Sequence, residues 1–203
     1  MNHRLMTMLF LFAGLVLIPA VASANPSEDA QNRSQELFEA GLVLWDERNY
    51  EGALVQFSNA IATNPANIDA WYYQGLTFAR LQRYEEAIAS YDNVSVLDPS
   101  NAVARFNRGT NLARLNRTDE ALVSYEEAIN LDSEYAFPWY NKGNILADSG
   151  DYPAALASYT KAIELDSTFS LAWKGKADVL AKMGRSSESI EAYNTARTID
   201  ESV

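Results

Sequence analysis

The chain contains no cysteine and a single histidine, His3. The absence of cysteine excludes disulfide bonds, thiolate catalysis and metal sites built on cysteine ligands. Cysteine and histidine supply most of the nucleophiles, general bases and transition-metal ligands of enzymes. No pair of carboxylates is singled out by the sequence for acid–base chemistry either. The sequence therefore predicts a protein that is not an enzyme and that holds no metal or cofactor.

Basic residues are also scarce. Lysine and arginine number 16 against 27 aspartates and glutamates, which gives 203 residues a formal net charge of −11. Nucleic acids and anionic membrane surfaces both attract proteins through basic faces. This charge balance predicts that the chain binds neither of them.

A long apolar run occurs once, at the N-terminus. Arg4 precedes an apolar core of fourteen residues, 5–18, and Pro19 and the small residues 22–24 follow it. This order is that of a secretory signal peptide, residues 1–24, cleaved after Ala24. An uncleaved membrane anchor is the alternative, because an apolar stretch of about 18 residues is near the lower limit for spanning a bilayer. Either interpretation predicts an exported protein that lies at the cell surface, in the cell envelope or outside the cell. The protein would be tethered to the membrane if the N-terminal segment is not cleaved.

After a polar leader, residues 25–33, the sequence repeats every 34 residues, in blocks 34–67, 68–101, 102–135, 136–169 and 170–203. Small residues recur at positions 8 and 20 of each block, and an aromatic residue recurs at position 24. Position 8 is Gly41, Gly75, Gly109, Gly143 and Ala177, position 20 is Ala53, Ala87, Ala121, Ala155 and Ser189, and position 24 is Phe57, Tyr91, Tyr125, Tyr159 and Tyr193.

The spacing within a block predicts two helices. Positions 4, 8 and 11 lie on one face of a first helix, and positions 20, 24 and 27 lie on one face of a second helix. Glycine and alanine on these faces would let the two helices approach closely, with the aromatic side chains filling the space around the contact. Each hairpin would expose apolar surface until the next one packs on it, so neighbouring repeats would share their stability.

This pattern resembles the tetratricopeptide repeat, and the resemblance covers the whole chain after the leader. It implies an all-α fold, a right-handed superhelical α-solenoid of five antiparallel helix hairpins whose first helices line a concave groove. Position 28 changes from Ile61, Ser95, Ile129 and Ile163 to Arg197 in the last block. A charged residue suits an outermost helix that faces water, and we expect this helix to fray.

Positions 2, 5, 9, 12 and 13 face the groove in the family. Position 5 carries an aromatic residue in four blocks, and apolar residues at position 2 (Phe137, Leu171) widen this stripe in the later repeats. The stripe could hold the apolar side chains of an extended peptide or stack on sugar rings, or it could only stiffen the contacts between repeats. Its residues are Phe38, Tyr72, Phe106 and Tyr140.

Two arginines at position 13, Arg80 and Arg114, indicate a basic patch near the centre of the groove, to which Arg105 and Arg108 would add charge. Such a patch could accept a carboxylate or an acidic segment through bidentate hydrogen bonds. The alternative is that these arginines are solvated and neutralise acidic neighbours.

Asparagines at positions 6 and 9 resemble the amides that hold a peptide backbone in clamp-type members of the family. The lysine and the basic pair that complete that clamp are absent here, so a carboxylate clamp is not predicted. The asparagines are Asn107, Asn141 and Asn144.

The leading hypothesis is therefore a non-catalytic, exported scaffold that binds a protein or peptide in its concave groove. A glycan-binding module of the cell envelope, which would use the aromatic stripe, is the alternative. A hydrolase that uses carboxylates alone is a third and weaker hypothesis, because no motif supports it.

Overall fold

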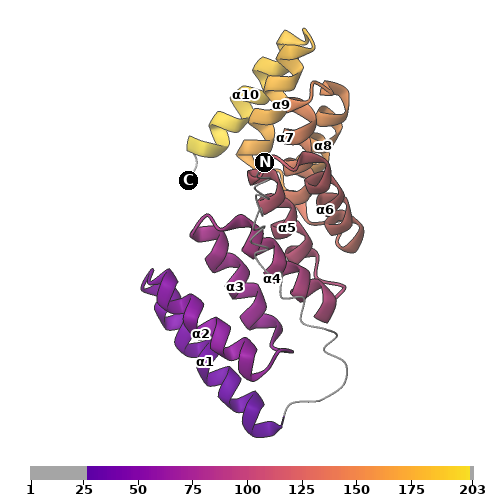
Figure 1. Ribbon diagram of the computed structural model, residues 1–203. Coiled ribbons are helices and arrows are strands. Elements are labelled where there is room, and N and C mark those ends of the chain that lie inside the picture. The colour runs from indigo at the N-terminus through magenta and orange to yellow at the C-terminus, as the bar shows by residue number, and fades with distance from the viewer. Residues whose placement is uncertain (1–26, 202–203) are drawn as a thin grey trace, which may run out of the picture.

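The computed structural model describes residues 27–201, and all regular secondary structure in this range is helical (Figure 1). The signal peptide expected at residues 1–24 lies outside the described residues. The helices are α1 (Glu28–Asp46), α2 (Tyr50–Thr63), α3 (Ile68–Arg80), α4 (Tyr84–Leu97), α5 (Ala102–Arg114), α6 (Thr118–Leu131), α7 (Ala136–Asp148), α8 (Tyr152–Leu165), α9 (Ser170–Lys182) and α10 (Ser186–Glu201).

Successive helices form hairpins that stack into an elongated array, from α1–α2 at the indigo end to α9–α10 at the yellow end (Figure 1). The second helix of each hairpin packs on the first helix of the next hairpin. First helices also touch one another directly, as α7 and α9 do, whereas α6 with α8 and α8 with α10 make no contact of that extent. The first helices therefore lie on the inner side of the array, and the predicted all-α solenoid of hairpins is confirmed.

Polar side chains begin several of the helices. Asn49, Asn67, Asn101 and Asp151 each accept a hydrogen bond from the backbone N–H three residues further on, which satisfies one of the free donors of the first turn. Ser27 does the same for α1, with its Oγ 3.2 Å from the backbone nitrogen of Ala30. Because of this cap, α1 starts inside the segment that the sequence presents as a polar leader.

The turn between the two helices of each hairpin contains one residue with a left-handed backbone conformation (positive φ), at position 15 of the repeat. Two of these residues are glycines, and the other three are not. They are Arg48 (φ 61°), Gln82 (60°), Asn116 (58°), Gly150 (86°) and Gly184 (75°).

The small residues lie between the helices, as the repeat pattern predicts. Ala53, Ala87, Ala121 and Ala155 are fully buried. A Cβ atom placed on Gly143 would lie 2.8 Å from the ring of Tyr159, and one placed on Gly175 in the next hairpin would lie 2.6 Å from the same ring. Glycine at both points is therefore what allows one tyrosine to fill the space between two hairpins.

The last hairpin differs because no further hairpin covers it in the described residues. Tyr193 is 54% exposed, whereas Tyr91 at the same repeat position is 1% exposed. Helix α10 is continuous to Glu201, where Arg197 forms an ion pair with this residue across one turn. No helix between residues 27 and 201 is both long and apolar enough to cross a membrane.

Candidate functional site

Two adjoining cavities follow the inner side of the last three hairpins. The larger, of about 570 Å³, lies between α7 and α9, and the smaller, of about 300 Å³, lies between α5 and α7. They share Asn144 and Asp148 of α7, so they form one continuous depression, which we call the groove. Its lining combines residues from both ends of the first helices with the tyrosines of the second helices, Tyr125 and Tyr159.

The predicted aromatic stripe is not uniform. Phe38 is only 7% exposed, because its ring packs 5.8 Å from that of Phe57 and 5.5 Å from that of Tyr73 (centroid distances). Tyr73 stands at repeat position 6, where the third and fourth blocks carry asparagine, and its larger side chain covers Phe38. Phe38 therefore belongs to the core and drops out of the candidate site.

The other three stripe residues are partly buried. The rings of Tyr72, Phe106 and Tyr140 lie 5.9 to 6.0 Å from the position-24 tyrosine of their own hairpin. These contacts stabilise each hairpin, so the stripe serves packing as well as any ligand. Tyr140 is the stripe member that lines the larger cavity.

Apolar side chains at repeat position 2 are more exposed than the stripe. Val103, Phe137 and Leu171, which we call the apolar rim, are 41%, 50% and 50% exposed. The ring of Phe137 lies 5.0 Å from Phe169 and 6.2 Å from Phe106, so aromatic contacts hold it in place. The sequence indicated Phe137 and Leu171 but not Val103, which only its repeat position could have identified.

The three asparagines all meet tyrosine hydroxyls. Asn107 Nδ2 donates to Tyr72 Oη (3.3 Å) and Asn141 Nδ2 donates to Tyr125 Oη (3.4 Å), whereas Asn144 Oδ1 accepts from a tyrosine hydroxyl. That last bond, from Tyr159, is 2.7 Å long and leaves the Nδ2 donors of Asn144 without a partner among residues 27–201. Since an amide carries two donors and an acceptor, Asn144 can still bind a peptide carbonyl at the junction of the two cavities.

Burial controls the protonation of these tyrosines. It raises the pKa of Tyr159 and of Tyr125 above the ordinary value, because the charged phenolate would lose its solvation. Burial also raises the pKa of Tyr72, although the hydrogen bond from Asn107 opposes this shift. The hydroxyls therefore stay protonated at neutral pH and act as hydrogen-bond donors and acceptors rather than as bases.

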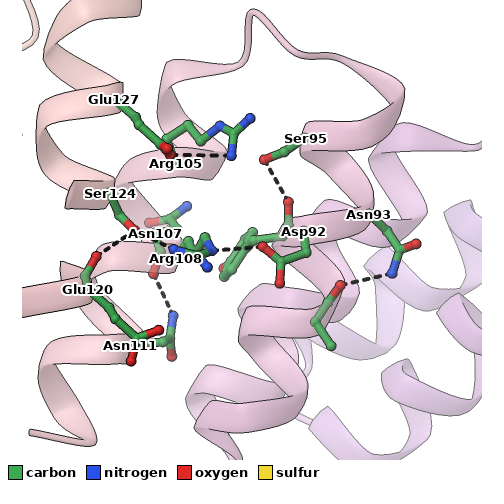
Figure 2. Close-up of polar contacts among 12 residues, drawn as sticks. Asp92, Asn93, Ser95, Arg105, Asn107, Arg108, Asn111, Glu120, Ser124 and Glu127 are labelled. Carbon is green, nitrogen blue, oxygen red and sulfur yellow. Dashed lines mark hydrogen bonds and ion pairs between the residues drawn. The ribbon is translucent and has the colours of Figure 1, made fainter. Parts of the chain in front are cut away.

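The basic residues divide into two groups. Arg80 and Arg114 are exposed at the ends of α3 and α5, and neither forms an ion pair in the described part of the chain. Arg108 instead bonds Asp92 (2.7 Å) and Ser124 (2.6 Å), as Figure 2 shows.

Arg105 likewise pairs with Glu127, at 3.3 Å (Figure 2). Together with Arg108 it lines a separate cavity of about 210 Å³ beside α6, where Glu127 pairs with Arg105 and Glu120 pairs with Arg117. The expectation that Arg105 and Arg108 add charge to the groove is therefore wrong. Their carboxylate partners lie on α4 and α6, which repeat spacing alone did not reveal.

Within residues 27–201 no group of three or more acidic or histidine side chains is placed to hold a metal ion. The polar residues that line the groove are amides, hydroxyl-bearing residues and charged side chains of both signs. Such groups suit hydrogen bonding and charge pairing with a ligand.

Comparison with known proteins agrees with this architecture. Tetratricopeptide repeat models match residues 38–102 and 136–169, and a TPR repeat model matches residues 111–150. No curated protein matches the chain significantly.

One solved structure with the same fold is MamA, residues 41 to the end, from Desulfovibrio magneticus RS-1. It is 16% identical in sequence, the match covers 84% of this chain and 97% of that chain, and the TM-score is 0.76. Another is pilF of Pseudomonas aeruginosa, with 21% identity, 84% and 78% coverage and a TM-score of 0.74. YrrB, described as a TPR protein with an unusual peptide-binding site, has 20% identity, 85% and 89% coverage and a TM-score of 0.68. With these matches and its stacked hairpins, the chain belongs to the tetratricopeptide repeat family.

Proposed function

We propose that this chain is a non-catalytic scaffold that holds an extended segment of a partner protein in the groove of its last three repeats. The observation that carries the proposal is the apolar rim. Leu171 is half exposed on the wall of the larger cavity, and Phe137 is half exposed and held by Phe169. Covering the exposed half of each side chain with a ligand would contribute about 1 kcal/mol of binding free energy.

Polar groups in the same groove suit a peptide backbone. Asn144 retains unpaired amide donors between the two cavities, and Asn141 lines the smaller one. An extended peptide presents a carbonyl and an amide at each residue, so donors at fixed points along a groove can hold it without reading its side chains. The peptide-binding site described for YrrB, a protein of the same fold, is consistent with this use.

We also propose that the scaffold acts outside the cytoplasm. This part rests on the N-terminal sequence, where a basic residue, an apolar core and small residues before position 25 follow the order of a signal peptide. Protein sequencing of the N-terminus of the exported chain would decide between release, with a new terminus at Asn25, and tethering, with Met1 retained.

The groove can be tested by site-specific photo-crosslinking of the full chain in the cells that make it. A photoreactive residue in place of Phe137 should produce an adduct with a partner protein, because this side chain is half exposed on a first helix, at the repeat position of Leu171, which lines the larger cavity. The same residue in place of Val96, which is 77% exposed on α4 and lines neither cavity, is the control. Mass spectrometry of the adducts identifies the partner.

Two outcomes would contradict the scaffold. One is an identical set of protein adducts from both positions, which would mean that the groove is not the contact surface. The other is a glycan array that binds the chain and loses binding in Tyr72→Ala and Tyr140→Ala, while no protein adduct forms at position 137. That pattern would favour the glycan-binding module.

A further inference from the structure

Most cationic side chains between residues 27 and 201 are neutralised by a carboxylate within the chain. The exceptions in this range do not scatter at random. Lys176 stacks on the ring of Trp173 at 5.1 Å, and Arg48 occupies the first hairpin turn. The remaining three stand at one repeat position, the last residue of α3, α5 and α9, and they are Arg80, Arg114 and Lys182.

A helix end explains only part of this arrangement. The negative end of the helix dipole favours a cation in the last turn, which suits the three unpaired residues. The same dipole disfavours Asp148, which ends α7 at the equivalent position and makes no ion pair within the described residues. Asp46 ends α1 in the same way outside the groove, so what distinguishes Asp148 is that it lines both cavities.

The charges along this wall of the groove therefore change from one end to the other. Arg114 lines the smaller cavity, and Arg80 stands at the same repeat position one hairpin earlier, just beyond the lining of the groove. In the larger cavity Lys182 faces two carboxylates, Asp148 and Asp178. A further lysine there, Lys174, is already paired with Asp200 of α10. The inner side of the array is thus basic at the ends of α3 and α5, and the balance becomes acidic in the larger cavity, where Asp148 and Asp178 outnumber the unpaired Lys182.

We infer that the groove selects a partner segment that is acidic where it passes Arg80 and Arg114, and apolar and free of acidic residues where it passes Phe137 and Leu171. This inference rests on the proposed function and adds the composition and the direction of the bound segment. Carboxylates on the segment would form charge-assisted hydrogen bonds with Arg80 and Arg114, which have no ion-pair partner within residues 27–201. Its apolar residues would cover the rim, and Asp148 and Asp178 would repel a second acidic group there.

The spacing of the two features on the ligand follows from the geometry. Neighbouring first helices are about 10 Å apart, so α5 and α9 are about 20 Å apart. Arg114 ends α5 whereas Leu171 stands in the first turn of α9, which adds about 16 Å along the helices and places the two residues about 26 Å apart. An extended chain advances about 3.3 Å per residue. An acidic pair and an apolar pair whose centres are about eight residues apart would therefore reach both Arg114 and Leu171.

The test uses three fluorescein-labelled dodecapeptides and the full chain, with binding measured by fluorescence anisotropy at low salt. The first peptide carries a Glu pair and a Leu pair at the spacing above, joined by a neutral serine–glutamine spacer. The second carries Lys in place of the Glu pair, and the third carries Ser in place of the Leu pair. We expect the first peptide to bind about tenfold more tightly than either of the others.

The variants then connect each preference to its residues. Arg80→Gln with Arg114→Gln should weaken the first peptide about tenfold, because the acidic pair loses its partners, and should not weaken the second, whose lysines lose two like-charged neighbours. Arg48→Gln is the matched control, since it removes an unpaired arginine far from the groove and the next repeat carries Gln82 at that position. Leu171→Ala should weaken both Leu-containing peptides, whereas Leu131→Ala, 43% exposed outside the groove, should not.

Different results would contradict the acidic preference alone and the peptide-binding function as a whole. Equal binding of the Glu and Lys peptides, with both still weakened by Leu171→Ala, overturns the acidic preference and leaves a peptide-binding groove. Equal losses from Arg48→Gln and from the double arginine variant overturn it as well. If none of the three peptides binds at millimolar concentration, both this inference and the peptide-binding function fall.

Discussion

At the scale of single residues, a tyrosine of one hairpin fits against the bare backbone of two glycines. Tyr159 is 3% exposed and lies between Gly143 of its own hairpin and Gly175 of the next. Its hydroxyl is also fixed by the hydrogen bond to Asn144. The ring therefore cannot move aside to admit an added methyl group. The last repeat carries Ala177 in place of the glycine, and there the corresponding Tyr193 is exposed and free to move.

We predict that Gly143→Ala destabilises the chain by about 1 kcal/mol. The added Cβ would lie 2.8 Å from the ring of Tyr159, and overpacking of this kind costs about 1 to 3 kcal/mol, offset by about 1 kcal/mol of improved helix propensity. Urea unfolding followed by circular dichroism measures the change. Adding Tyr159→Leu removes the clashing ring atoms, so the double variant should lose less than the sum of the two single losses. An unchanged or higher urea midpoint for Gly143→Ala would contradict the argument.

Whether the burial or the ion pairs of a residue could be predicted from the sequence depended on whether its neighbours repeat with it. The buried glycines and alanines follow from repeat spacing, because every interior hairpin places them against the same neighbour. The burial of Phe38 could not be predicted, because it depends on Tyr73 of the next hairpin rather than on its own repeat position. The ion pairs of Arg105 and Arg108 also cross between helices, and their partners stand at different repeat positions.

At the scale of helices and turns, the chain uses the same left-handed residue in each hairpin with different side chains. Position 15 is glycine in the last two repeats, where a turn could be predicted from residue type. Arg48 and Gln82 adopt the same conformation, with φ of 61° and 60°, although neither residue favours it. The array imposes this geometry, because the two helices of every hairpin must meet at the same angle for neighbouring hairpins to stack.

We predict that Gly150→Ala destabilises the chain by about 1 kcal/mol. Gly150 has φ of +86° and open space where a Cβ would lie, so backbone strain acts there without any steric clash. The reverse change, Gln82→Gly, should be neutral or stabilising by less than about 1 kcal/mol, since relief of strain is offset by the flexibility of glycine in the unfolded chain. Differential scanning calorimetry of both variants checks the pair. A Gly150→Ala variant as stable as the parent chain would show that the turn relaxes.

At the scale of the whole molecule, each interior hairpin contributes a buried tyrosine to the contact with its neighbour, so the array shares one response to alkaline pH. Burial raises the pKa of Tyr135 to about 12 and raises the pKa of Tyr91, Tyr125 and Tyr159 as well. In an unfolded chain a tyrosine ionises at about pH 10. The folded state therefore holds its phenolic protons more tightly than the unfolded state does.

We predict that the free energy of unfolding is unaffected by these tyrosines below about pH 10 and falls between about pH 10 and 12. In that window the unfolded chain releases phenolic protons that the folded chain retains, so rising pH favours unfolding.

Urea unfolding at a series of pH values measures how steeply the free energy of unfolding falls with pH, and absorbance of tyrosinate shows whether ionisation coincides with unfolding. Lysine side chains in general also lose their protons near this range, so a control for the tyrosines is needed. Tyr135→Phe isolates the tyrosine contribution, because the Tyr135 side chain forms no hydrogen bond within residues 27–201 and only its titration is removed. The slope above pH 10 should be shallower in that variant. An identical slope, or tyrosines that ionise at about pH 10 in a chain that stays folded, would show that the buried hydroxyls do not link the array to pH.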